Sequence, residues 1–146
     1  MTEYAAYGSM FWTAFLAATF LPGASEILLV SLLVSGTVDH WLLLTAATVG
    51  NTAGSIVNCF FGAFLAQYRD RRWFPVPAKQ LENASRFFQR YGLWSLLIAW
   101  APIIGDALTV IAGMLRIRLL PFTVIVGIGK FARYSFVSGT TSAFIT

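Results

Sequence analysis

The chain has 146 residues, of which 58% are hydrophobic and 11% are charged, and its formal net charge is +4. A mean hydropathy of +0.72 excludes an ordinary soluble domain and predicts a single all-α integral membrane domain over residues 1–146. The net basic charge does not predict a nucleic-acid partner, because the Lys and Arg residues lie mainly between apolar segments, where they report membrane topology.

Four apolar runs, near 11–35, 41–68, 92–115 and 120–146, are each long enough to cross a bilayer as a helix. They are continuous and lack the period-two alternation of a membrane strand, so helices are expected and a barrel is not. No Lys or Arg precedes the first run, so a removable signal peptide is not expected.

The first run is interrupted by Pro22 and Gly23, and Ser25 and Glu26 follow directly. This break predicts a re-entrant hairpin of two half-helices, the first over 11–21, with Ser25 as a candidate cap of the second. Free N–H groups at such a tip favour an anion. A kinked helix that crosses the membrane, or a capped turn without a ligand, is the simpler alternative.

The helix expected over 41–68 carries Gly50, Gly54, Asn58 and Gly62 at every fourth position. Small residues at this spacing favour close helix packing, and Asn51 and Asn58 are candidates for hydrogen bonds across the contact. Direct contact of this face with a substrate is the alternative.

The polar link 67–90 holds six of the ten basic residues, which predicts that it is cytoplasmic. The six are Arg69, Arg71, Arg72, Lys79, Arg86 and Arg90. The loop 36–40 has no Lys or Arg and is expected on the opposite face. Two prolines exclude a helix before Ala78, and 78–90 is predicted to be an interfacial helix on anionic headgroups.

The third run is broken in the same way, by Pro102 and Gly105, with Asp106 next along the chain. It predicts a second re-entrant hairpin of two half-helices of about ten residues each. If this segment turns back, Arg116 and Arg118 stay on the cytoplasmic side with the basic link.

An internal repeat with an offset of 80 residues favours two hairpins, since Pro22 corresponds to Pro102 and Glu26 to Asp106. The predicted parts are a first repeat (1–66), a link (67–90) and a second repeat (91–146). One hairpin would enter from each side, so the halves are expected to have inverted topology, as in many secondary transporters, with both termini periplasmic. A homodimer is expected, because two whole helices per chain cannot easily cover two hairpins.

The last run carries Lys130 and Arg133 on one helix face, with Tyr134 beside Lys130. With Glu26 and Asp106 they form four intramembrane charges that sum to zero. Either all four form structural ion pairs, or the bases bind a phosphate headgroup while a carboxylate carries a proton.

Catalytic chemistry is not predicted. Cys59 is the only cysteine and lies in an apolar run, His40 is the only histidine, and no activated serine motif is present. No catalytic residue, metal site or cofactor is therefore expected.

Motifs spread over nearly the whole chain resemble those of a known family. They are LPG-x-SE, GN, RYG, W-x-P-x-x-GD, AG-x-x-R and GK-x-x-RY. The combination is similar to the DedA superfamily, whose domain is also called the VTT domain, and specifically to its small YqaA-like branch. The resemblance implies a bacterial inner-membrane protein with two re-entrant hairpins that moves lipids, such as undecaprenyl phosphate or phospholipids, between leaflets, often with proton coupling.

The wider family has arginines in the second hairpin, in a pattern like R-F-x-P-x-x-R, where this chain has Trp100 and, roughly, Asp106. Its basic residues appear instead as Lys130 and Arg133 in the next helix, whereas Glu26 fits the family well. The leading hypothesis is a dimeric transporter or flippase for an anionic lipid. An accessory protein that stabilises a partner complex and an ion or small-solute transporter are the alternatives.

Overall fold

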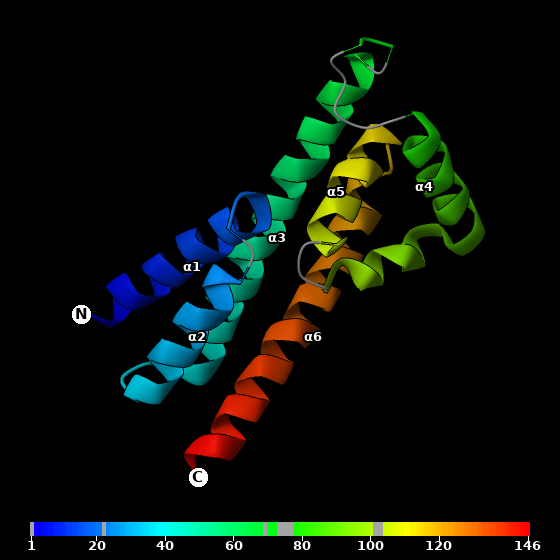
Figure 1. Cartoon of the computed structure of the whole chain (residues 1–146). Helices are drawn as coiled ribbons and strands as arrows, with labels where there is room; N and C mark the ends of the chain where they lie inside the picture. Colours follow the sequence, from blue (N-terminus) through cyan, green and yellow to red (C-terminus); the bar gives the residue numbers. More distant parts are fainter. Residues whose placement is uncertain (1, 22, 69, 73–77, 101–103) are drawn as a thin grey trace.

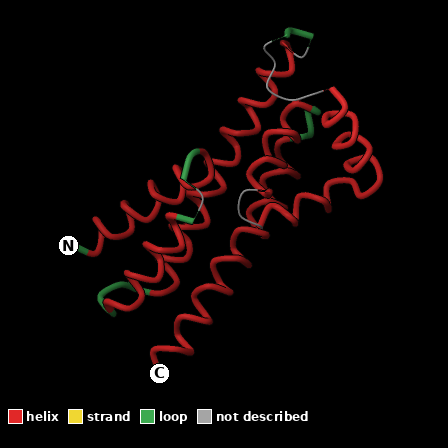
Figure 2. The backbone as a smooth tube through the Cα atoms, in the orientation of Figure 1, coloured by secondary structure: helices red, strands yellow, loops and turns green. Residues whose placement is uncertain are grey.

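The computed structural model describes residues 2–21, 23–68, 70–72, 78–100 and 104–146. Every regular element in these ranges is helical, so the all-α prediction is confirmed (Figures 1 and 2). The elements are α1 (Glu3–Thr19), α2 (Ala24–Ser35), α3 (His40–Leu65), η1 (Ala66–Tyr68), α4 (Ala78–Tyr91), η2 (Gly92–Trp100), α5 (Ile104–Met114) and α6 (Leu119–Ile145).

Two helical stretches are long and apolar enough to cross a membrane, judged by length and composition. They are α3 with η1, 29 residues, and α6, 27 residues. The helix α3 begins where the Asp39 carboxylate accepts hydrogen bonds from the N–H groups of Trp41 and Leu42, at 2.9 and 3.0 Å. The two stretches pack against each other and run in opposite directions (Figure 1).

The first half of the chain places α1 and α2 side by side against α3 (Figure 1). The predicted start of α1 at residue 11 was wrong, because Ala6 and Met10 are also buried and extend the packed helix back to Glu3. The prediction that Ser25 caps α2 was also wrong. Gly23, with φ 92°, occupies that position, and the buried Ser25 hydroxyl is used in a contact with α6 instead.

The second half starts with α4, which begins at Ala78 as predicted. The segment after it was expected to be an α half-helix, but η2 is a nine-residue 3₁₀ helix. A 3₁₀ helix rises about 2.0 Å per residue, so it spans more distance than an α-helix of equal length. Gly105 lies inside α5 and not in the break. Pro22 and Pro102, the other predicted tip residues, lie outside the described residues.

Glycines allow α3 to touch both its neighbours, which confirms the predicted close packing. A methyl group added at Gly50 would overlap the carbonyl oxygen of Phe11 in α1. One added at Gly62 would overlap the carbonyl oxygen of Val110 in α5. Backbone contact of this kind is what small residues permit between membrane helices.

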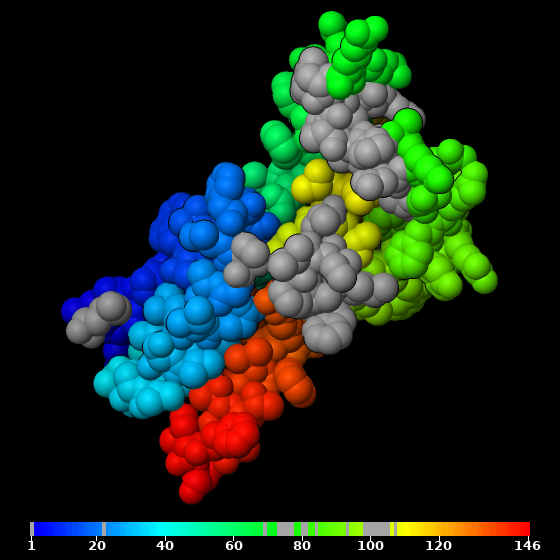
Figure 3. All heavy atoms as spheres, in the orientation of Figure 1, coloured from blue at the N-terminus to red at the C-terminus, as the bar shows by residue number. Residues whose placement is uncertain are grey.

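The molecule is elongated, with different parts of the chain at its two ends (Figure 1). The α2–α3 turn and the end of α6 lie at one end, whereas α4 and the α5–α6 turn lie at the other. The last turns of α6 stand clear of the other elements in Figure 3, and Phe144 there is 91% exposed. The basic residues of the link and of the α5–α6 turn are therefore gathered at one end, away from the C-terminus.

Candidate functional site

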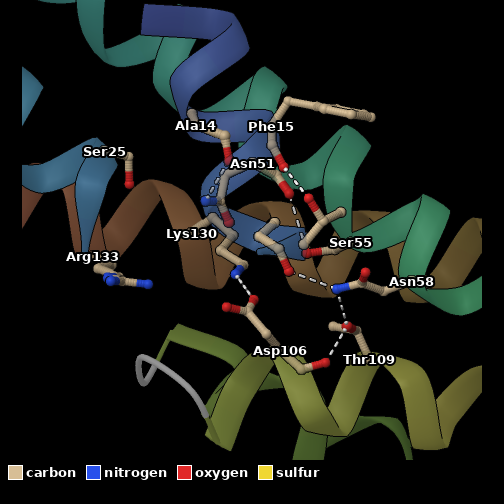
Figure 4. A network of polar contacts seen from close by, with 12 residues as sticks. Ala14, Phe15, Ser25, Asn51, Ser55, Asn58, Asp106, Thr109, Lys130 and Arg133 are labelled. Atoms are coloured by element: carbon tan, nitrogen blue, oxygen red, sulfur yellow. Dashed lines mark hydrogen bonds and ion pairs between the residues drawn. The ribbon is translucent and has the colours of Figure 1, made fainter. Parts of the chain in front are cut away.

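A buried ion pair joins α6 to α5. The Nζ atom of Lys130 donates to Oδ1 of Asp106 at 2.9 Å, and the Lys130 side chain is 0% exposed (Figure 4). The Asp106 side chain is 17% exposed. A charge in apolar surroundings is stable only when it is paired, so each of these residues depends on the other.

A second ion pair, between Arg133 and Glu26, joins α6 to α2. The two side chains are 9% and 18% exposed. Tyr134 extends this contact, because its hydroxyl donates to Oγ of Ser25 at 2.9 Å, and Ser25 in turn donates to Oε2 of Glu26 at 3.4 Å. The four charges singled out from the sequence thus form two separate pairs, both reached from α6.

The two acids occupy equivalent places in the fold. Glu26 is in the first turn of α2, and Asp106 is in the first turn of α5. Backbone N–H groups without helical partners and the helix dipole stabilise negative charge at such positions. Both acids contact the middle of α6 and neither is near its ends. Each carboxylate therefore has two sources of stabilisation, a helix start and a basic side chain.

Amide side chains of α3 connect the two halves beside the ion pairs (Figure 4). Asn51 donates to the carbonyl oxygen of Ala14 at 2.9 Å. Asn58 donates to the carbonyl oxygen of Ala18 at 2.7 Å and to Oγ1 of Thr109 at 3.3 Å. The predicted hydrogen bonds of both asparagines across the helix contacts are therefore confirmed, and Asn58 links α1 to α5.

Sequence reasoning missed Thr109 and Ser138. Thr109 is fully buried and donates to the carbonyl oxygen of Asp106 at 2.6 Å, so it joins Asn58 to the start of α5. Ser138 Oγ lies 2.9 Å from Nε2 of His40. The signal for Ser138 was its spacing, because Lys130, Tyr134 and Ser138 recur every four residues and all three are buried.

The described residues contain no group of three His, Cys, Asp or Glu side chains that could hold a metal ion. The chemistry available is electrostatic. Arg and Lys bind carboxylate and phosphate oxygens in the same way, so a phosphate can replace a carboxylate as the partner of either base.

Two long apolar helices around paired charges define a helical membrane protein with a charged centre. The chain belongs to the VTT domain family, whose sequence profile matches residues 21–142. Inner membrane protein YqaA of Escherichia coli is 38% identical over 141 residues, which cover 97% of this chain and 94% of that protein.

More distant relatives extend this picture. An uncharacterized protein of Haemophilus influenzae is 35% identical over 133 residues, covering 86% of this chain and 80% of that one. Undecaprenyl phosphate transporter A of Staphylococcus aureus is 28% identical over 116 residues, covering 72% of this chain and 57% of that one. These are names of membrane and transport proteins and not of enzymes. No solved structure gives a significant match to the chain.

Proposed function

We propose that the chain is a transporter of the inner membrane that moves an anionic lipid, such as a polyprenyl phosphate or a phospholipid, between leaflets. One observation carries the proposal. Two basic and two acidic side chains, all largely buried, meet halfway along a helix that is long enough to cross the membrane. Intramembrane charges are costly and commonly mark the path of a charged substrate.

The proposed topology is an inverted repeat of two re-entrant hairpins, α1–α2 and η2–α5, each followed by a crossing helix. The bounds of the elements support it. At an offset of 80 residues, α2 starts at Ala24 and α5 at Ile104, while α3 starts at His40 and α6 at Leu119. The packing also corresponds, since α1 lies on α3 as η2 lies on α6. In this topology the basic link is cytoplasmic and both termini are periplasmic.

The ion pairs provide a two-state mechanism. In the paired state Glu26 and Asp106 neutralise Arg133 and Lys130, and the centre is closed to other anions. A lipid phosphate that approaches Arg133 competes with Glu26, and protonation of the displaced carboxylate lowers the cost of leaving it unpaired. Proton coupling follows if Glu26 takes up its proton from one side and releases it to the other.

The substrate class is supported by the relative from Staphylococcus aureus, which is named an undecaprenyl phosphate transporter. A homodimer is part of the proposal, because a second copy would cover hairpin surface that one chain leaves facing lipid. Asn51, Asn58 and Tyr134 would hold the hairpins around the charges and need not touch the substrate.

Reconstitution tests the proposal. Wild-type protein in liposomes is expected to speed the movement of a fluorescent polyprenyl phosphate to the outer leaflet, in comparison with protein-free liposomes. A pH gradient applied across the liposomes tests proton coupling in the same assay. Lipid movement no faster than in protein-free liposomes, together with co-purification of a stoichiometric partner, would instead favour the accessory role. A pH-driven ion or solute flux without lipid movement would favour a solute transporter.

A further inference from the structure

The turn between α5 and α6 has an unusual backbone at Arg116. Its φ is 54°, and it is the one non-glycine residue with a positive φ among the described residues. The Arg116 N–H bonds the carbonyl of Gly113 at 3.0 Å, and the Ile117 N–H bonds that of Ala112 at 3.2 Å. These bonds form a helix-ending motif whose left-handed position is normally filled by glycine.

The first half of the chain fills the same position with glycine. Gly36 ends α2 with φ 65°, and it precedes Arg116 by the repeat offset of 80 residues. A left-handed backbone disfavours a side chain, so arginine at this position brings a backbone cost that glycine avoids. Backbone strain that persists in a fold points to a use for the side chain that carries it.

The Arg116 side chain borders an open groove of about 400 Å³ between the end of α3 and the α5–α6 turn. The walls are mostly apolar, with Phe60, Ala63 and Phe64 from α3 and Ile117 and Leu119 from the turn. Phe60 and Phe64 are 62% and 53% exposed. The groove thus offers apolar side chains beside a single exposed cation, and its volume is in the range of small-molecule sites, about 300–1,000 Å³.

Position and charge identify an occupant. The groove lies at the end of the molecule where the basic residues gather (Figure 1), and within the described residues Arg116 has no ion-pair partner. Basic residues beside a membrane segment attract anionic headgroups, and a guanidinium matches the geometry of a phosphate. The groove is separate from both buried ion pairs, because none of its lining residues takes part in them.

We infer that this groove is a binding site for an anionic phospholipid of the surrounding bilayer. The Arg116 guanidinium holds the phosphate, and one acyl chain lies along Phe60 and Phe64. The site holds a membrane lipid at the edge of the fold, and it does not depend on the transport proposal.

The test uses purified full-length protein and phosphatidylglycerol with a photoreactive acyl chain, with cross-links mapped by peptide mass spectrometry. Labelling is expected within residues 59–67. Arg116→Gly should weaken it about ten-fold, the loss expected for one charge-assisted contact. The same variant should fold at least as well as wild type, because glycine suits the left-handed backbone. Arg86→Gln, which removes an exposed charge from α4, should leave labelling within twofold of wild type, in line with the small effect of exposed charges.

Three outcomes would overturn the inference. They are wild-type labelling in Arg116→Gly, equal labelling by a photoreactive phosphatidylcholine, and labelling by a polyprenyl phosphate but not by phosphatidylglycerol. If Arg116→Gly fails to fold, Arg116→Asn gives the same test, since asparagine also accepts this backbone. Arg116→Lys should retain part of the labelling, because it keeps the charge.

Discussion

Lys130 and Asp106 lie 24 residues apart in sequence and form a hydrogen-bonded ion pair at 2.9 Å, with the lysine side chain wholly buried. Removing one member of such a pair leaves an uncompensated charge, whereas removing both leaves none. The relationship therefore predicts a strongly non-additive response to substitution.

Lys130→Met is expected to destabilise the protein by about 3–5 kcal/mol, since Asp106 would lose its partner. The double variant Lys130→Met/Asp106→Asn should recover much of this loss. Free energies of unfolding in a mild detergent provide the measurement. Arg86→Gln is the control, because the exposed Arg86–Glu82 pair should contribute less than about 1 kcal/mol. A Lys130→Met variant as stable as this control would contradict the expectation.

The backbone contact of α3 with α5 predicts a difference between two glycines. Gly62→Ala should destabilise the fold by about 1–3 kcal/mol or more, because the added methyl group meets the Val110 carbonyl. Gly139→Ala makes the same chemical change in α6, where no atom lies within 4 Å. It should be neutral or slightly stabilising. Thermal unfolding of the two variants compares them directly, and equal unfolding temperatures would rule out tight packing at Gly62.

Asn58 connects α1 to α5, so its loss should loosen the contact between the two halves. Asn58→Leu is expected to cost about 0.6–1.7 kcal/mol, the range for hydrogen bonds between membrane helices. Thr140→Val is a suitable control, because that hydroxyl bonds only carbonyls of its own helix. Hydrogen exchange of α1 and α5 amides should rise in Asn58→Leu and not in the control. Unchanged exchange would show that Asn58 does not couple them.

The proposed topology predicts opposite accessibility for two turns. In a Cys59→Ser background, Thr37→Cys should react with a membrane-impermeant maleimide added to cells with a permeabilised outer membrane. Arg118→Cys should react only after the inner membrane is opened. The two turns lie at opposite ends of the molecule (Figure 1). Labelling of Arg118→Cys in unopened cells would exclude the second re-entrant hairpin.

Much of the fold was predictable because its signals are strong. Long apolar runs predicted the two crossing stretches, two prolines predicted the start of α4 at Ala78, and glycines at every fourth residue predicted the close packing of α3. The start of α1 was missed because weakly polar residues before residue 11 hide a helix stabilised by packing. The 3₁₀ form of η2 has no signal in its apolar sequence.

The candidate site was predictable as a set of residues but not as a set of contacts. A sum of zero charge suggested pairing, yet Glu26 could have paired with Lys130 as readily as with Arg133. The choice depends on the angles at which α2 and α5 meet α6, which spacing along one chain does not specify. Ser25 was assigned to a cap from local preference, and a tertiary contact with Tyr134 outweighed it. Thr109 was missed because a threonine in an apolar run resembles ordinary core.

The most direct measurement is the rate at which a fluorescent polyprenyl phosphate crosses liposomes that contain the triple variant Glu26→Gln, Asp106→Asn and Arg133→Ala. The triple variant keeps Lys130 as the one remaining charge of the four, so its folded fraction is first matched to wild type by gel filtration. If the paired charges form the substrate site, the rate should fall by at least about ten-fold, the effect of losing one strong charge-assisted interaction. Arg86→Gln should retain the wild-type rate. A wild-type rate in the triple variant would show that the lipid crosses without these charges.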